Sequence, residues 1–151
     1  MHKHFWWRGV SLVLVLVLAV WLYGAWERSR GPQLVVGAEV FSLEVAETEE
    51  ARIRGLSGRT TLASDAGMFF KFEKVGMHCF WMRDMKFALD IIWLDSNNSV
   101  VHIEQSAQPV SYPDTFCPDA AVASAVELPA GSAARVGIEL GDTLTFRGLS
   151  E

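Results

Sequence analysis

Residues 89–94 read Leu-Asp-Ile-Ile-Trp-Leu, a stretch in which five side chains are apolar and one is an acid. A run that is apolar on both of its alternating faces predicts a strand in the middle of a sheet, covered on both sides. The carboxyl of Asp90 must then be neutral or hydrogen-bonded, because an unpaired buried charge costs several kcal/mol. We interpret Asp90 either as a structural acid that ties loops together, with backbone amides, Arg83 or Arg59 as partners, or as a functional acid in a cleft.

Short strands are predicted on both sides of this run. The segments that alternate in polarity or are rich in Phe, Trp and Ile are 40–46, 67–72, 78–85, 100–105, 122–128 and 143–146. The polar turn 95–99 predicts a hairpin between 89–94 and 100–105. Thr48 can cap a short helix that Gly55 ends, and a second short helix is predicted at 130–136. Seven short strands and two small helices predict a mainly β fold, a compact β-sandwich or barrel-like domain.

The N-terminal segment has a different composition from the rest of the chain. Residues 10–26 carry no charge and are strongly apolar apart from Ser11 and Gly24, with tryptophans at both ends. Such a run is near the lower limit for a helix that spans a bilayer. We predict a signal anchor with one transmembrane helix at 1–30, a linker at 31–37 and a β-rich domain at 38–151. A cleaved signal peptide is the alternative, although bulky residues stand where cleavage needs small ones.

Charge and topology together predict where the domain resides. The N-terminal tail is short, which favours keeping it inside and placing the rest on the extracytoplasmic side, the periplasm in a Gram-negative cell. Residues 31–151 contain nine Lys and Arg against 17 Asp and Glu, a formal charge of −8. Nucleic acid and anionic headgroups repel such a surface. We therefore expect no nucleic-acid partner, and contact with the membrane only through the N-terminal helix.

Several spaced motifs occur in order along this domain. They are Gly58-Arg59, Asp-Ala-Gly-Met-Phe-Phe at 65–70, His-Cys-Phe-Trp-Met-Arg-Asp at 78–84, Leu-Asp-Ile at 89–91, Glu-Leu-Pro-Ala-Gly at 127–131, Gly137-Ile138 and Gly141-Asp142. This series resembles the bacterial and archaeal family known as domain of unknown function 192, over roughly residues 38–147. The resemblance implies a compact β-rich domain, often exported, with no established biochemical activity.

The chain departs from the family pattern at several positions. Relatives usually read Phe-Trp-Met-Lys-Asn-Thr in the central motif, whereas Arg83, Asp84 and Met85 fill the last three places here. Ala88 replaces a proline, and Ala123 stands near the place where relatives tend to carry a basic residue. A basic group that serves an anionic ligand in relatives would therefore be missing from this chain.

The two cysteines, Cys79 and Cys117, are 38 positions apart. A lone pair in a small exported domain is usually a disulfide, and the resemblance implies the same pairing, because some relatives carry Cys at both places. A metal site of His78, Cys79, His102 and Cys117 is disfavoured, since it lacks the short Cys-x-x-Cys spacing of zinc sites. A free, reactive Cys79 is the other alternative. We expect no metal.

Six residues form the predicted candidate surface for a ligand or partner, because they are polar or aromatic and lie beside apolar strands or turns. They are Arg59, Trp81, Arg83, Asp84, Asp90 and Glu127. Trp81 could equally be a packing residue. We find no motif for nucleotide binding, for a serine nucleophile or for a zinc peptidase, and we expect no cofactor.

The sequence favours a membrane-anchored extracytoplasmic module that binds a small ligand or a cell-envelope partner. The alternative is a small hydrolase that uses Asp84, Asp90 or Glu127 as acid or base. The sequence does not single out any of the three as the catalytic residue. An enzyme of this kind should bring two of these carboxyls to one cavity and raise the pKa of one of them.

Overall fold

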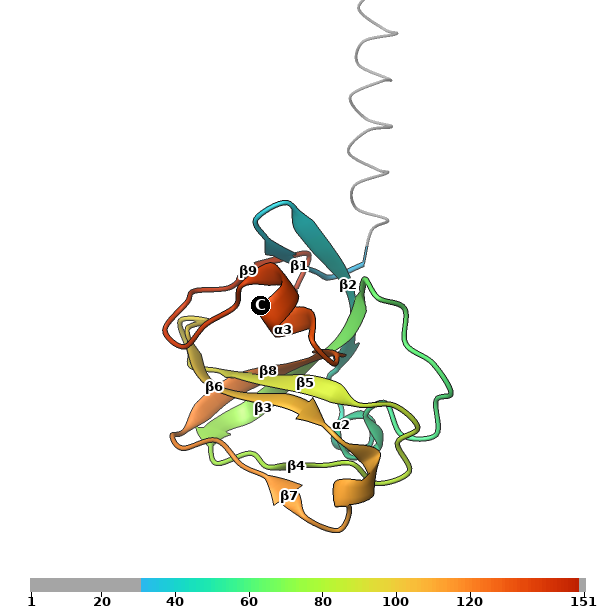
Figure 1. Ribbon diagram of the computed structural model, residues 1–151. Helices are drawn as coiled ribbons and strands as arrows, with labels where there is room; N and C mark the ends of the chain where they lie inside the picture. Colours follow the sequence, from blue (N-terminus) through green and yellow to red (C-terminus); the bar gives the residue numbers. More distant parts are fainter. Residues whose placement is uncertain (1–30, 150–151) are drawn as a thin grey trace, which may run out of the picture. The chain divides into compact units, whose positions relative to one another are not determined.

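The structure is a computed structural model that describes residues 31–149. The fold is mainly β, with one seven-stranded sheet, one two-stranded sheet and two short α-helices (Figure 1). The strands are β1 (Gln33–Val36), β2 (Glu39–Ala46), β3 (Ala66–Gly76), β4 (Phe80–Trp81), β5 (Leu89–Leu94), β6 (Val100–Ala107), β7 (Thr115–Phe116), β8 (Val122–Pro129) and β9 (Thr145–Arg147). The helices are α2 (Glu49–Arg54), α3 (Ser132–Val136) and the 3-10 turn η1 (Pro109–Ser111).

β5 lies inside the large sheet, as the sequence predicts. The strand order is β6-β5-β8-β3-β2-β1-β9, so β5 has a hydrogen-bonded neighbour on each side. All six of its residues are buried. The 95–99 turn joins it to β6 in the predicted hairpin, in which Asp95 Oδ1 accepts from the backbone N–H groups of Asn97 and Ser99.

The large sheet curls into a half-barrel. Its pairings are antiparallel except that of β2 with β3, which is parallel. At one end the sheet's edges meet, because Ser99 bridges Thr143 and the Leu144 N–H donates to the Asn98 carbonyl at 2.9 Å. The coarse prediction of a mainly β, barrel-like domain is confirmed. A single curled sheet takes the place of the two packed sheets that a sandwich would have.

The two faces of the sheet carry separate apolar clusters. The α3-side cluster lies on the face that α3 covers, and consists of Leu34, Phe41, Leu43, Phe69, Ile92, Leu94, Val100, Val126, Leu128, Ala133, Ile138 and Leu144. The β4-side cluster lies on the other face, beneath α2 and the β4-β7 ribbon (Figure 1). It consists of Ala46, Leu56, Met68, Phe70, Met82, Met85, Leu89, Ile91, Trp93, Ala107, Val122 and Ala125.

Two predicted boundaries are wrong. Residues 33–36, predicted as part of the linker 31–37, form β1, which pairs with β2 and β9 and buries Leu34 completely. The segment 78–85, predicted as one strand, pairs only at Phe80 and Trp81. It leaves the extended conformation at Asp84, whose φ is +59°.

Within residues 31–149 there is no helix long and apolar enough to cross a membrane. The span predicted at 1–30 lies outside the residues that the structure describes.

Candidate functional site

A pocket of about 560 Å³ lies on the β4 side of the sheet. Its volume is within the range of sites that hold small molecules, about 300–1,000 Å³. The lining residues come from α2 and the turn after it, from β3, from β4 and the segment before it, and from single positions near β5 and on β8. They are Glu49, Arg52, Ile53, Arg54, Gly55, Leu56, Ser57, Phe70, Phe72, Glu73, Lys74, Met77, His78, Cys79, Phe80, Trp81, Met85 and Glu127.

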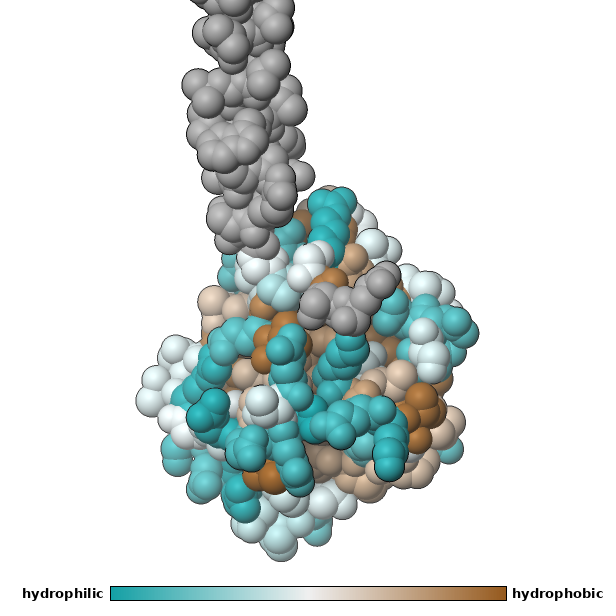
Figure 2. Space-filling view, turned by 180° about the vertical axis from the view of Figure 1, so that it is seen from behind, coloured by the Kyte–Doolittle hydropathy of each residue, from teal (hydrophilic) through white to brown (hydrophobic). Residues whose placement is uncertain are grey.

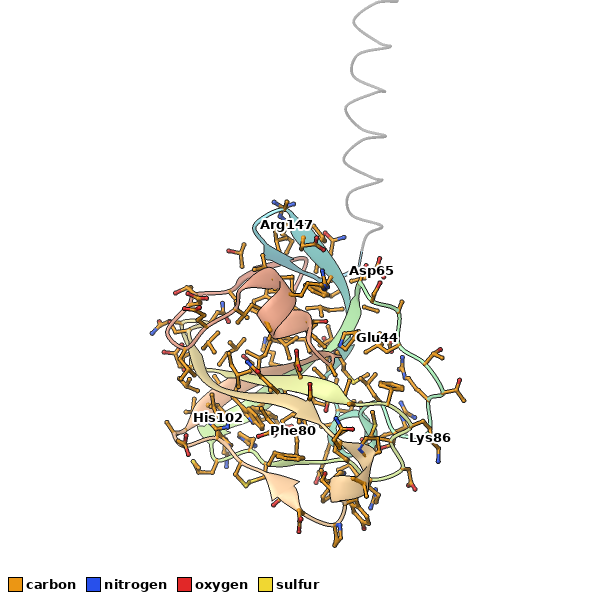
Figure 3. All side chains as sticks on the ribbon, viewed as in Figure 1. Glu44, Asp65, Phe80, Lys86, His102 and Arg147 are labelled. Atoms are coloured by element: carbon orange, nitrogen blue, oxygen red, sulfur yellow. A yellow bond between two sulfur atoms is a disulfide. The ribbon has the colours of Figure 1, made fainter. Side chains whose placement is uncertain are left out.

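Aromatic side chains form a large part of the pocket wall. The ring of Phe80 meets that of Phe70 edge to face, with the ring centroids 4.8 Å apart. The ring of Phe80 also meets that of Trp93, with the ring centroids 5.5 Å apart. Figure 3 shows Phe80 on the side of β4 that faces the main sheet. Phe72 is stacked on His78 at 3.7 Å. These contacts fix the wall, because each ring is held by a second one.

Glu127 supplies the pocket's buried polar group. It is 5% exposed and lies on β8 opposite Met68 of β3 and Ile91 of β5. Its Oε2 atom has no hydrogen-bond partner among the described residues. Burial raises the pKa of the Glu127 carboxyl to about 8, because the charged form loses its hydration. The group is therefore mainly a neutral acid at pH 7, able to donate one hydrogen bond and to accept others.

The backbone beside Glu127 is packed unusually closely. A Cβ atom placed on Gly67 of β3 would lie 2.6 Å from the Glu127 carbonyl oxygen and 2.7 Å from Leu128 Cδ2. Only glycine fits there without moving β8 away from β3. This contact gives a physical reason for the glycine in the Asp-Ala-Gly-Met-Phe-Phe motif.

Arg52 closes one side of the pocket. Its Nη1 donates to the carbonyls of Glu47 at 2.7 Å and Lys71 at 3.2 Å. Its Nη2 contacts Glu73 Oε1 at 3.2 Å, and the side chain is only 17% exposed. The guanidinium therefore joins α2 to the end of β3. The sequence analysis did not single out Arg52, because no motif includes it.

Trp81 and Arg83 form a stacked pair at the pocket's outer wall. Trp81 is 40% exposed and lines the pocket, and the Arg83 guanidinium lies 5.0 Å from its ring centroid. The carbonyl of Arg83 accepts from Ser57 Oγ at 2.8 Å, and that of Asp84 accepts from the Gly58 N–H at 3.0 Å. The exposed Asp84 side chain does not line the pocket.

Arg59 lies outside the pocket and pairs with an acid on β2. Its guanidinium pairs with both carboxylate oxygens of Glu44 on β2, with Nη2 to Oε2 at 2.7 Å. The hydrogen bond to Glu44 raises the pKa of Arg59 and lowers the pKa of that carboxyl. Neither residue lines the pocket.

Asp90 is a buried structural acid on the α3 face. Its Oδ1 accepts from the N–H groups of Ser106 at 2.9 Å and Gly131 at 3.0 Å, and its Oδ2 accepts from the Ala133 N–H at 2.8 Å. Three backbone amides hold it, as one of the two interpretations of the sequence proposed. Of the six candidate residues only Trp81 and Glu127 line the pocket, so the three acids of the hydrolase alternative do not meet.

Cys79 and Cys117 form a disulfide. The bond joins the residue before β4 to the residue after β7, so it holds the short ribbon together at one end. Both cysteines of the four-residue metal site considered above are thus bonded to each other. Across residues 31–149 no three His, Cys, Asp or Glu side chains are grouped closely enough to hold a metal ion.

Polar residues cover most of the back face of the domain. Figure 2 shows hydrophilic side chains over most of that face and hydrophobic ones in separate small areas. Some large apolar side chains are nevertheless exposed at the pocket, and these are Ile53, Met77 and Trp81.

The sequence of this domain matches one known family. The sequence pattern of domain of unknown function 192, described as an uncharacterized ACR, matches residues 33–146. The chain therefore belongs to this family. The match begins at β1 and ends in β9, so it includes every strand of the half-barrel.

Two solved structures are similar to the domain. A protein of unknown function from Novosphingobium aromaticivorans shares 32% identity and a TM-score of 0.70, over 76% of this chain and 83% of that one. A protein from Sinorhizobium meliloti described as a "putative transcription regulator" shares 29% identity and a TM-score of 0.71, over 78% and 93%. No curated protein matches the chain.

Proposed function

We propose that this protein is a membrane-anchored extracytoplasmic binding module whose ligand occupies the pocket above Glu127. The observation that carries the proposal is a buried carboxyl oxygen, in a cavity of about 560 Å³, that has no hydrogen-bond partner within residues 31–149. An unsatisfied buried polar atom is unfavourable by about 1–3 kcal/mol, and a ligand that hydrogen-bonds to it would remove that cost.

The pocket's composition suits an amphipathic small molecule. Phe70, Phe72, Phe80 and Trp81 offer apolar contact area, whereas Glu127 offers one polar contact at depth. Sites for small ligands commonly combine apolar walls with a few placed polar groups. Binding is favoured over hydrolysis because Asp84 and Asp90 do not reach this cavity.

The location of the module is part of the proposal. The apolar, uncharged run at 10–26 supports a membrane anchor, and a disulfide is typical of an oxidising compartment. The charge of −8 on residues 31–151 disfavours nucleic acid as a partner, although one solved relative is described as a transcription regulator.

Methionine methyl groups provide a direct test of binding. Met77 and Met85 line the pocket, whereas Met68 and Met82 are buried outside it. The full chain, labelled at its methionine methyls and held in lipid nanodiscs, would be titrated with benzyl alcohol. We expect saturable shifts of the Met77 and Met85 signals and little change at Met82. Met68, which lies opposite Glu127, should shift with Met77 and Met85 if the ligand reaches that carboxyl.

A pair of exposed aromatic residues supplies the matched variants. Trp81→Ala removes part of the pocket wall and should weaken benzyl alcohol binding, whereas Tyr112→Ala removes a similarly exposed ring that lies outside the pocket and should not. Equal, unsaturable shifts at all four methionines, or none at Met77 and Met85, would contradict the proposal.

A further inference from the structure

We infer that the ligand of this pocket carries an organic ammonium group that pairs with Glu127. The inference rests on the proposed binding function and names the chemical class of the ligand. Three observations support it: the carboxyl has no counter-charge, the wall around it is aromatic, and one wall residue already holds a cation.

Among residues 31–149, no cationic side chain forms an ion pair with Glu127. The ionisable groups that line its cavity are Glu49, Arg52 and Arg54 on α2, Glu73 and Lys74 on β3, and His78 before β4. None of these groups is paired with Glu127, and burial is the cause that raises the pKa of its carboxyl. Arg52, moreover, is held by Glu73 and two backbone carbonyls.

The neighbours of Glu127 on the adjacent strands are apolar. Met68 of β3 and Ile91 of β5 flank it, and Asp90 of β5 faces the other side of the sheet. Since residues 31–149 supply no positive charge that pairs with Glu127, we assign that charge to a ligand.

The pocket wall is suited to such a charge. Aromatic faces attract ammonium and guanidinium groups, and the attraction increases where water is excluded. The Arg83 guanidinium lies 5.0 Å from the centroid of Trp81, which shows this interaction at the pocket's outer wall. The rings of Phe70, Phe72 and Phe80 line the interior of the same cavity.

Binding of an alkylammonium ion would release one proton. The neutral Glu127 carboxyl loses its proton to solvent, and the resulting carboxylate pairs with the R–NH₃⁺ group, so the charge inside the pocket remains balanced. Affinity should then rise about tenfold per pH unit until pH reaches about 8, the pKa of the free carboxyl, and level off above it. A ligand that uses the neutral acid as hydrogen-bond donor would instead bind less tightly above that pH.

Benzylamine and benzyl alcohol form a matched pair of probes, because they differ only in an ammonium against a hydroxyl group. Both would be titrated into the full chain in nanodiscs at several pH values between 6 and 8, with the Met77 and Met85 methyl signals as readout. We expect benzylamine to bind more tightly at pH 8, with an affinity about tenfold higher at pH 7.5 than at pH 6.5. Benzyl alcohol should show no such rise.

Glu127→Gln tests the role of the carboxyl itself. It keeps the shape of the neutral acid, so it should fold, but it cannot ionise. We expect it to weaken benzylamine binding at pH 8 by at least about tenfold and to abolish the pH dependence. Glu139→Gln, the same change at an exposed acid outside the pocket, should leave both unchanged.

The results separate this inference from the proposed function. If benzyl alcohol saturates the pocket as tightly as benzylamine and neither shows the pH rise, the ammonium class is wrong and the binding function stands. If neither probe shifts Met77 and Met85, the binding function fails as well. Benzylamine binding with an unchanged pH rise in Glu127→Gln would also overturn the pairing with Glu127.

Discussion

Two buried acids on neighbouring strands have opposite environments. Asp90 on β5 faces α3 and accepts three backbone hydrogen bonds. Glu127 on β8 faces the β4 side, and its Oε2 has no partner in the described part of the chain. The amides that surround Asp90 satisfy its carboxylate and fix the nearby loops. Glu127 lowers the stability of the free domain, but it places a polar group inside a cavity. Groups that are unfavourable for stability in this way are typical of binding sites.

Glu127 should make the domain less stable as the pH rises. Its pKa is about 8 in the folded state against 4.5 for the ordinary group, so between these values the unfolded chain releases a proton that the folded chain retains. The free energy of unfolding should fall across this window, by about 3 kcal/mol at pH 7. Urea unfolding of the full chain, followed at the buried Met82 methyl, would measure it.

Glu127→Gln removes this titration. It should match the wild type near pH 4.5 and exceed it in stability by about 3 kcal/mol at pH 7. Glu139→Gln is the control for a change of charge at the surface. Parallel stability curves for Glu127→Gln and the wild type between pH 5 and pH 8 would show that Glu127 is not the group responsible.

Asp90→Ala should be strongly destabilising at all pH values where the domain folds. It leaves the N–H groups of Ser106, Gly131 and Ala133 without their acceptor, and we expect a loss of about 3–5 kcal/mol. Urea unfolding checks the loss, and Asp114→Asn, at an exposed acid, serves as the control. A loss below about 1 kcal/mol would mean that water replaces the carboxylate readily.

At the scale of elements, the pocket exists because α2 and the β4-β7 ribbon lie over one face of the sheet. The ribbon pairs at only two positions on each strand, so the disulfide and the packing of Phe80 hold it in place. The Trp93 indole adds a hydrogen bond from Nε1 to the His78 carbonyl at 2.7 Å. The pocket wall therefore depends on links from a few residues rather than on an extended hydrogen-bond ladder.

Loss of the disulfide should destabilise the ribbon. Cys79 and Cys117 are 38 positions apart, and the chain-entropy relation for such a loop gives about 3–4 kcal/mol. A double Cys79→Ser, Cys117→Ser variant should show this loss in urea and faster hydrogen exchange in residues 78–81 and 115–117. Unchanged exchange there would show that packing alone holds the ribbon. Intact protein should also gain two hydrogens in mass on reduction.

Gly67→Ala tests the close contact between β3 and β8. The added methyl would lie 2.6 Å from the Glu127 carbonyl oxygen, so the strands must separate, and we expect a loss of at least about 2 kcal/mol. Gly31→Ala, where a Cβ meets nothing within 4 Å, is the matched control. Equal stability of the two variants in urea would refute the argument from close packing.

The elements that could be predicted are those whose own residue pattern indicates what packs against them. β5 is apolar on both faces and its bounds agree with the prediction, and Thr48 caps α2 as expected. β1 was missed because it is only four residues long and follows Gly31 and Pro32, so the segment has the composition of a linker. The pocket could not be predicted, because its residues come from separate segments whose positions depend on the curl of the sheet.

At the scale of the whole molecule, the chain combines two parts of opposite character. Residues 10–26 carry no charge, whereas residues 31–151 carry a formal charge of −8. Within that part, residues 31–149 fold around two apolar clusters. An acidic domain is repelled by anionic headgroups and has no electrostatic reason to stay at a bilayer. Retention at the membrane, if it occurs, must therefore depend on the N-terminal run.

A charge placed in this run should release the protein from the membrane. Each Lys at the centre of a spanning helix is unfavourable by about 2.5–3.5 kcal/mol on insertion scales, so Val15→Lys with Val17→Lys should abolish anchoring. We expect the wild-type chain to stay in the membrane fraction after alkaline carbonate extraction and the variant to leave it. Val110→Lys, at a position that is 89% exposed in the folded domain, should behave like the wild type.

The same protein can report on which side of the membrane the domain lies. In spheroplasts of a Gram-negative host, added protease should degrade the domain while a cytoplasmic marker stays intact, because the short N-terminal tail is expected to remain inside. Protection of the domain in spheroplasts, with loss of protection only after lysis, would place it in the cytoplasm. The pocket would then meet cytoplasmic ligands, and the disulfide would form in a reducing compartment, where such bonds are rare.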